Sequence, residues 1–224
     1  MSFYLWIDII IVSIPLLLSF EKKIFYFKKW PYVLGSVLIV GPVYIAWDIL
    51  ATDLAHWSFN PQYVGTARIF NLPIPEVLFF VVVPFSCIFI YEVVQYFSKD
   101  REIYFNKNII YAFVFILMGL SLFYENQDYT SISLVFLAGF LFLSVSSFRK
   151  IVFRKNFFLY LAICYIPFLI FNGILTSIPV VMYNPKAIWG MRIFSIPIED
   201  FIYNLTFLGF SVVIYKVLID KKFS

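Results

Sequence analysis

Long apolar runs alternate with short polar segments along the whole chain. Seven of these runs approach the roughly 20 residues that an α-helix needs to cross the hydrocarbon core of a bilayer, and the fourth run is the shortest. The pattern predicts an all-α integral membrane protein with about seven transmembrane helices. The runs cover approximately residues 3–20, 31–50, 76–98, 109–123, 131–148, 157–178 and 198–219.

The composition supports a membrane protein. Apolar residues make up 62% of the 224 residues and charged residues only 13%, which leaves too little polar material to cover a water-soluble globule of this size. The two cysteines, Cys87 and Cys164, stand alone within apolar runs, so neither a disulfide scaffold nor a metal site is expected. The eight glycines are scattered and form no dinucleotide-binding fingerprint.

The distribution of basic residues predicts how the chain is oriented. Fourteen of the 17 Lys and Arg residues fall in segments that would lie on one side of the membrane, and by the positive-inside rule that side is cytoplasmic. A multi-pass protein of the cell membrane is expected, with its N-terminus outside and its C-terminus in the cytoplasm. The net charge of +4 then reflects topology, and nucleic acid is not an expected partner. The fourteen cations are Lys22, Lys23, Lys28, Lys29, Lys99, Arg101, Lys107, Arg149, Lys150, Arg154, Lys155, Lys216, Lys221 and Lys222.

One stretch of the chain occurs twice. Residues 60–76 read NPQYVGTARIFNLPIPE and residues 184–200 read NPKAIWGMRIFSIPIED, with seven identities in 17 ungapped positions. The offset of 124 residues relates the first three apolar runs to the last three and leaves the fourth as a connector. Because the shift is an even number of runs, both units should point the same way, as a parallel 3+1+3 internal duplication. We expect a first repeat at 1–98, a connecting helix with its loops at 99–130 and a second repeat at 131–224.

Each repeated stretch ends in proline followed by an acid at the mouth of an apolar run. Proline and a carboxylate are favourable in the first turn of any helix, so a purely structural role is one interpretation. Ionisable groups inside a membrane are more often functional, and a carboxyl group in apolar surroundings can hold a proton and donate it. The candidate catalytic residues are Glu76 in the first copy, Glu199 and Asp200 in the second, and Asp48 near the end of the second run.

Arginine and aromatic residues accompany these acids. Arg68 and Arg192 either keep a carboxylate ionised or anchor the repeated loop, and the sequence leaves both readings open. Aromatic rings such as those of Phe79, Phe80 and Tyr203 mostly serve packing, but their faces also stabilise a cation without reacting with it. A buried acid beside an aromatic, water-poor cavity suits protonation of an alkene and control of the carbocation that results.

The two corners, together with NGILTSIPVVMYN at 172–184 and RIFSIPIED at 192–200, resemble the small membrane lycopene cyclases. These are the non-flavin, two-repeat enzymes that occur as two subunits in some bacteria and as fused chains in others and in fungi. The resemblance implies conversion of the ψ end groups of lycopene to β-ionone rings, which gives β-carotene through γ-carotene without net redox change. It also implies no cofactor, lycopene and other carotenoids as substrates, and membrane lipid as surroundings; homo-oligomerisation is compatible with it.

The resemblance can be carried onto individual residues. The family's proline and paired acids fall on Pro197, Glu199 and Asp200, whereas the first copy has Pro75 in place of the first acid and keeps only Glu76. We hypothesise that Glu199 or Asp200 protonates the end group and that Glu76 or Asp48 removes the ring proton. The residues expected to shape the substrate site are Arg68, Arg192, Asn60, Asn184, Pro73, Pro197, Phe79, Phe80 and Tyr203.

Three other interpretations remain open at this point. A small-solute transporter can have the same 3+1+3 plan, although the third and seventh runs are apolar through the middle. A retinal- or carotenoid-binding protein without enzymatic activity could use Lys216 in the last run, but that lysine lies near the basic end, where snorkelling explains it. A non-enzymatic assembly subunit would fit the incomplete first corner.

Overall fold

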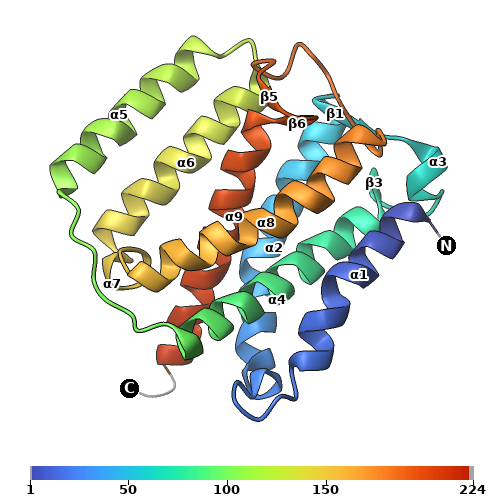
Figure 1. Cartoon of the computed structure of the whole chain (residues 1–224). Helices are drawn as coiled ribbons and strands as arrows, with labels where there is room; N and C mark the ends of the chain where they lie inside the picture. The colour runs from blue at the N-terminus through green and yellow to red at the C-terminus, as the bar shows by residue number, and fades with distance from the viewer. Residues whose placement is uncertain (1, 222–224) are drawn as a thin grey trace.

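Seven long helices form the body of the protein in a computed structural model that describes residues 2–221 (Figure 1). Met1 and Lys222, the latter one of the cations predicted to be cytoplasmic, lie outside the described residues. The long helices are α1 (Phe3–Leu18), α2 (Trp30–Asp53), α4 (Ile74–Phe97), α5 (Lys107–Phe123), α6 (Asp128–Ser146), α8 (Lys155–Ser177) and α9 (Ile198–Asp220).

Shorter elements connect these helices. Three of them are single helical turns, η1 (Tyr26–Lys29), α3 (Pro61–Val64) and α7 (Arg149–Val152). Six short strands form three two-stranded sheets: β1 (Trp57–Phe59) with β4 (Val181–Tyr183), β2 (Arg68–Ile69) with β3 (Leu72–Pro73), and β5 (Arg192–Ile193) with β6 (Ile196–Pro197).

Five of the helical segments are long and apolar enough to cross a membrane, which confirms the prediction of a helical membrane protein in its general form. These segments are Tyr26–Asp53, Ile74–Phe97, Asp128–Ser146, Lys155–Ser177 and Ile198–Asp220. The helices α1 and α5 are apolar but shorter, with 16 and 17 residues. At 1.5 Å per residue they extend about 24 and 26 Å, slightly less than a typical hydrocarbon core.

The two repeated corners begin helices in the same way. Pro73 and Pro197, both with φ near −60°, are the N-cap residues of α4 and α9, and Glu76, Glu199 and Asp200 lie in the first turns. Backbone amides at a helix N-terminus lack partners within the helix and carry a partial positive charge, which favours acids in that turn. The carboxyl groups are therefore placed at the ends of α4 and α9 that adjoin the strands.

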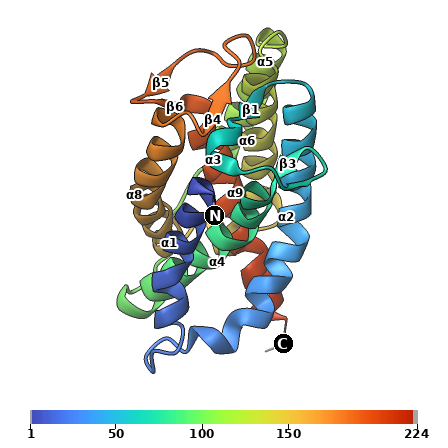
Figure 2. The same ribbon diagram turned by 90° about the vertical axis from the view of Figure 1, so that its right-hand side faces the viewer.

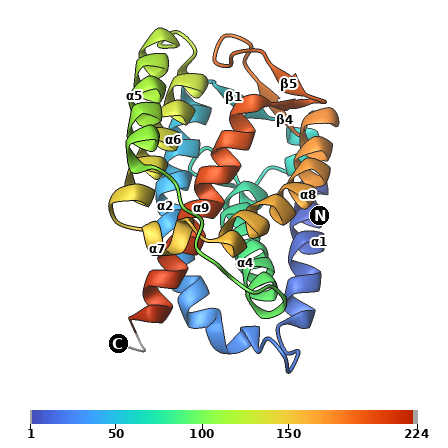
Figure 3. The same cartoon turned by 60° about the vertical axis from the view of Figure 1, so that its left-hand side comes forward.

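The helices α4 and α9 lie at the centre of the molecule. In the most apolar part of each helix, the share of residues buried inside the protein is 61% for α4 and 50% for α9, compared with 22% for α8. The helix α1 packs on α4, α6 packs on α9, and α2 contacts both central helices. Figures 1 and 3 show α9 running through the middle, with α5 and α6 on one side and α1 on the other.

The hairpins β2–β3 and β5–β6 repeat each other in detail. Arg68 pairs with Pro73 in one and Arg192 with Pro197 in the other, so the two registers differ by the same 124 residues. At the tips, Phe70 and Phe194 have φ values of 55° and 56°. Positive φ is unfavourable for a bulky side chain, and its occurrence at both tips shows that the two turns share one conformation.

The third sheet joins the two halves of the chain. In the antiparallel pair β1–β4, Ser58 lies opposite Met182, which is 124 residues later, and Trp57 lies opposite Tyr183. Pairing of equivalent residues in an antiparallel sheet is what a two-fold relation between the halves requires. Figure 2 shows the strands gathered at one end of the helical bundle, with the last turns of α9 near the opposite end.

Candidate active site

An elongated cavity of about 360 Å³ lies among α1, α4, α8 and α9 and reaches the β1–β4 pair. Along α4 its wall extends from Glu76 to Ile90, about 21 Å at 1.5 Å per residue. Ile10 and Ile14 of α1 also line it, and these residues are more than half exposed, so the cavity adjoins the exposed side of α1. The lining side chains with nitrogen or oxygen atoms are Tyr4, Asp48, Trp57, Glu76, Ser86, Tyr129, Asn172, Tyr183, Asp200, Tyr203 and Asn204.

Three of the four predicted catalytic acids meet at this cavity. Asp48 comes from the last turns of α2, Glu76 from the first turn of α4 and Asp200 from the first turn of α9. All three are buried, with exposed fractions of 2%, 8% and 5%. Because each belongs to a different helix and both repeats contribute, the cavity is a single site built jointly by the two halves of the chain.

Asp200 is held by three hydrogen-bond donors. The Tyr129 hydroxyl donates to Oδ1 over 2.7 Å, and the Asn172 amide and the Tyr183 hydroxyl donate to Oδ2 over 2.8 and 2.7 Å. The donors come from α6, α8 and β4, so three separate elements orient one carboxyl group. Tyr183 lies in β4, outside the spanning helices, and burial followed by the charge of Asp200 raises the pKa of its hydroxyl well above the usual value. That hydroxyl therefore remains a donor at neutral pH.

The first repeat provides fewer donors to its acids. The Trp57 indole donates to Asp48 Oδ1 over 2.8 Å, while Asp48 Oδ2 is buried without a hydrogen-bond partner among the described residues. A hydrogen bond links the Tyr4 hydroxyl to the Glu76 carboxyl group, and Asp48 and Glu76 line the same cavity. The first repeat thus brings two carboxyl groups together where the second has one carboxyl group and an amide.

Equivalent tyrosines approach the two corners. Tyr4 in the first turn of α1 is a partner of Glu76, and Tyr129 in the first turn of α6 is a partner of Asp200. The acids are 124 residues apart but the tyrosines are 125 apart. Comparison of the repeats at a fixed offset therefore misses the tyrosine pair.

Glu199 lies away from the cavity. It is fully buried, and its Oε1 accepts hydrogen bonds from the Thr130 hydroxyl over 2.5 Å and from the Trp189 amide over 2.7 Å. These contacts connect the start of α9 to α6 and to the loop before β5. The catalytic role of Glu199 stays a prediction; its contacts are those of a group that fixes the position of the α9 N-terminus next to Asp200.

The two arginines hold their own loops. Arg68 donates to the carbonyl oxygens of Gly65 and Ala67 over 2.8 and 3.3 Å, and Arg192 donates to that of Ser195 over 2.6 Å. These contacts favour the anchoring interpretation over direct pairing with a carboxylate. The Arg192 guanidinium also lies 5.7 Å from the centre of the Tyr183 ring, beside one of the donors to Asp200.

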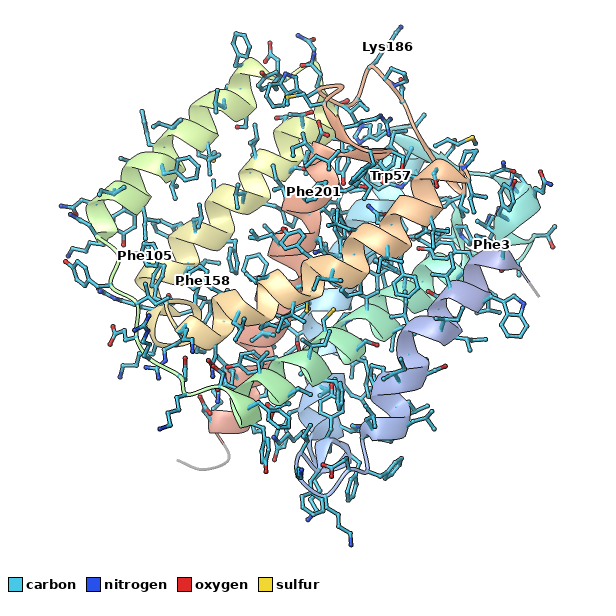
Figure 4. The ribbon with its side chains drawn as sticks, viewed as in Figure 1. Phe3, Trp57, Phe105, Phe158, Lys186 and Phe201 are labelled. Atoms are coloured by element: carbon cyan, nitrogen blue, oxygen red, sulfur yellow. The ribbon has the colours of Figure 1, made fainter. Side chains whose placement is uncertain are left out.

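The remaining predicted residues divide between the cavity and its frame. Phe79 and Tyr203 line the cavity, whereas Phe80 packs on Phe207 with ring centres 5.6 Å apart. Asn60 caps α3 by accepting from the amide of Gln62. Asn184 accepts in the same way from the amide of Lys186 and also donates to the Ala55 carbonyl oxygen. Figure 4 shows Trp57 at the end of the bundle from which the loop carrying Lys186 projects.

Five of the groups that hold the acids were not among the candidate site residues chosen from the sequence. These are Tyr4, Tyr129, Asn172, Tyr183 and the indole of Trp57. The equivalence of Asn172 and Asp48 was visible in the repeat, but tyrosine is common in this chain, with 16 residues, so its type gives no signal. Only packing brings these hydroxyl groups to the acids.

Comparison with known proteins agrees with the geometry. A family model described as lycopene cyclase matches residues 1–94 and 126–218, two segments that contain the two corners and leave out the whole of α5. Neither a search of curated proteins nor a search of solved structures gave a match. Because the family match spans most of the 224 residues, the chain belongs to the lycopene cyclase family.

Proposed function

We propose that this protein cyclises the ψ end groups of lycopene to β-ionone rings, with γ-carotene as intermediate and β-carotene as product. The observation that carries the proposal is the meeting of Asp48, Glu76 and Asp200, from both repeats, in one mostly apolar cavity that adjoins the exposed apolar side of α1. A linear hydrocarbon can enter such a slot from the membrane and leave its distal part in the lipid. A small polar solute would find few partners along these walls.

The reaction needs one proton to be added and one to be removed. A carboxylic acid protonates the terminal carbon–carbon double bond, which leaves a tertiary cation. The electrons of a nearby double bond in the same chain then form the ring bond, and the cation moves to the ring. A carboxylate removes a proton from the neighbouring ring carbon, so the product is an isomer of the substrate and no redox cofactor takes part.

Aromatic side chains along the cavity are suited to the cationic stages. The rings of Phe79, Tyr203 and Phe207 line it, and Tyr203 lies with its ring centre 4.8 Å from that of Trp47. Ring faces attract a cation but offer no lone pair that would trap it readily. A water-poor site also prevents capture of the cation as an alcohol.

We further propose that all seven long helices span the membrane as a parallel 3+1+3 duplication. The first repeat is then 1–98, the connector 99–130 and the second repeat 131–224. Support comes from the matching hairpins, the β1–β4 pair of equivalent strands and the family match in two segments. The basic loops support an orientation with the N-terminus and the two corners on the non-cytoplasmic side.

Both corners form one cavity at one end of the bundle, so each chain would process one end group at a time. A second ring then requires release and reorientation of the polyene, or a second copy of the chain in a homo-oligomer. A monocyclic intermediate should accumulate transiently in either case.

The test is pigment chromatography of cells that accumulate lycopene, with and without this chain expressed alone. Loss of lycopene with appearance of γ- and β-carotene is the expected result. The matched variant is Asp200→Asn, which keeps the size of the side chain. It should abolish most cyclisation while the protein remains in the membrane. Unchanged lycopene with the wild-type protein present in the membrane would refute the proposal for a self-sufficient enzyme.

A further inference from the structure

We infer that the two repeats have divided the proton chemistry between them: the Asp48–Glu76 pair donates the proton, and Asp200 accepts it. In this scheme Asn172, Tyr129 and Tyr183 are positioning residues that keep Asp200 an acceptor. The inference rests on the proposed cyclisation, and it reverses the roles that the sequence alone had led us to expect.

The hydrogen bonds around Asp200 support the acceptor role. All three partners donate to it, and each of its two oxygens is engaged, one by Tyr129 and the other by Asn172 and Tyr183. The Asn172 amide nitrogen can only donate, so it cannot receive a proton held on Oδ2. Three of the roughly four lone-pair sites of the carboxylate thus accept hydrogen bonds, and the remaining site on Oδ1 can take the proton that the substrate supplies.

The exchange of one residue between the repeats supports the donor role of the other pair. Asp48 and Asn172 are equivalent at the 124-residue offset, as are Glu76 and Asp200. Where the second repeat joins amide to carboxylate at 2.8 Å, the first has two carboxyl groups, Asp48 and Glu76, that line the same cavity. Two carboxyl groups in one apolar cavity are most stable when at least one of them is protonated. Asp48 Oδ2, buried and without a partner among the described residues, has a free site for that proton.

The β1–β4 pair connects the two corners. Trp57 and Tyr183 lie opposite each other in this sheet; Trp57 donates to Asp48 and Tyr183 donates to Asp200. The sheet therefore fixes the acid and the base at set positions on the same cavity. A cation formed beside Asp48 and Glu76 therefore lies in the same cavity as Asp200, so no large movement of the protein is needed.

The proton balance closes within the protein. The pair transfers one proton to the terminal double bond, the ring bond forms, and Asp200 takes one proton from the ring carbon. One proton then returns from Asp200 to the pair before the next turnover, so no external acid or base is consumed.

Deuterium exchange separates protonation from completion of the ring. The variants are Asp200→Asn, Glu76→Gln and Asp48→Asn, with the exposed Asp53→Asn and Glu125→Gln as matched controls. In membranes equilibrated with D₂O, Asp200→Asn should lower ring formation about 100-fold or more while deuterium enters the recovered lycopene, because the cation forms and reverts. Glu76→Gln and Asp48→Asn should give neither ring formation nor exchange, and both controls should behave like the wild type. Exchange in Glu76→Gln and Asp48→Asn but none in Asp200→Asn would overturn the assignment.

A binding measurement tests the inference without cyclisation. A tertiary amine with a linear isoprenoid tail is protonated at neutral pH and mimics the charge of the carbocation. Its affinity for purified protein should fall at least tenfold in Asp200→Asn and change less than threefold in Glu76→Gln. Equal losses in both variants, or a loss confined to Glu76→Gln, would refute the division of roles. If the wild-type protein does not cyclise lycopene, the proposed function is refuted. The amine affinities of the two variants still show whether Asp200 or Glu76 faces a bound cation.

Discussion

Tyr203 offers the sharpest test of cation stabilisation. Its ring lines the cavity together with Asp48 and Glu76 and contacts Tyr44 and Trp47 at centre-to-centre distances of 5.1 and 4.8 Å. Tyr203→Leu keeps an apolar side chain but removes the ring. Uncharged lycopene loses only apolar contact, whereas the cation loses an attractive ring face.

The size of the effect follows from the surroundings. A cation–π contact contributes about 0.5–1 kcal/mol at an exposed site and about 2 kcal/mol when desolvated. The cavity wall around Tyr203 is mostly apolar, so the upper figure applies. At about 1.4 kcal/mol per tenfold change in rate, Tyr203→Leu should lower kcat roughly 30-fold.

The assay is the rate of lycopene loss in proteoliposomes, expressed per folded protein. Tyr203→Phe is the matched variant, because it keeps the ring and removes only the hydroxyl group, and it should stay within about threefold of the wild type. Tyr203→Leu should also bind the isoprenoid amine more weakly while its KM for lycopene changes little. If Tyr203→Leu and Tyr203→Phe show the same kcat, the ring has no role in stabilising the cation.

Three further predictions concern stability and anchoring. Arg68→Ala and Arg192→Ala remove hydrogen bonds to carbonyl oxygens of the repeated loops, so each should lower the unfolding free energy by about 1 kcal/mol and leave the product ratio unchanged; a selective loss of activity at full stability would contradict the anchoring role. Glu92→Leu removes the acceptor for Lys29 and for the Tyr215 hydroxyl, at a position that does not line the cavity and lies about 24 Å along α4 from Glu76, and should lower thermal stability in detergent, by about 1–3 kcal/mol, with normal activity at low temperature. Gly209→Ala places a methyl group 2.6 Å from the Phe140 ring and should destabilise the α6–α9 contact by about 1–3 kcal/mol, whereas Gly139→Ala meets no atom within 4 Å and should be neutral; equal melting temperatures would refute the packing argument.

The repeated stretch shows how far the sequence alone could predict the fold. Hydrophobicity is a property of a continuous segment, so the apolar runs predicted the bounds of the long helices to within a few residues. The offset of 124 residues predicted that Arg68 and Arg192 occupy equivalent places, as do Glu76 and Asp200. Proline followed by an acid predicted where α4 and α9 begin, because helix starts depend on local chemistry. The family resemblance rests on the same linear patterns.

Only the tertiary structure decided which acids share a cavity and in which state they can work. Glu199 and Asp200 are neighbours in the sequence, but consecutive helical residues diverge by about 100°, so one faces α6 and the other faces the cavity. The donors to Asp200 lie 71, 28 and 17 residues away and reach it only because α6, α8 and β4 pack around the start of α9. Helix rotation and strand pairing between the halves depend on contacts among segments far apart in the chain, which no local pattern encodes. The sequence therefore determined the long helices, the repeated corners and the set of acids, and packing determined which of those acids share a cavity.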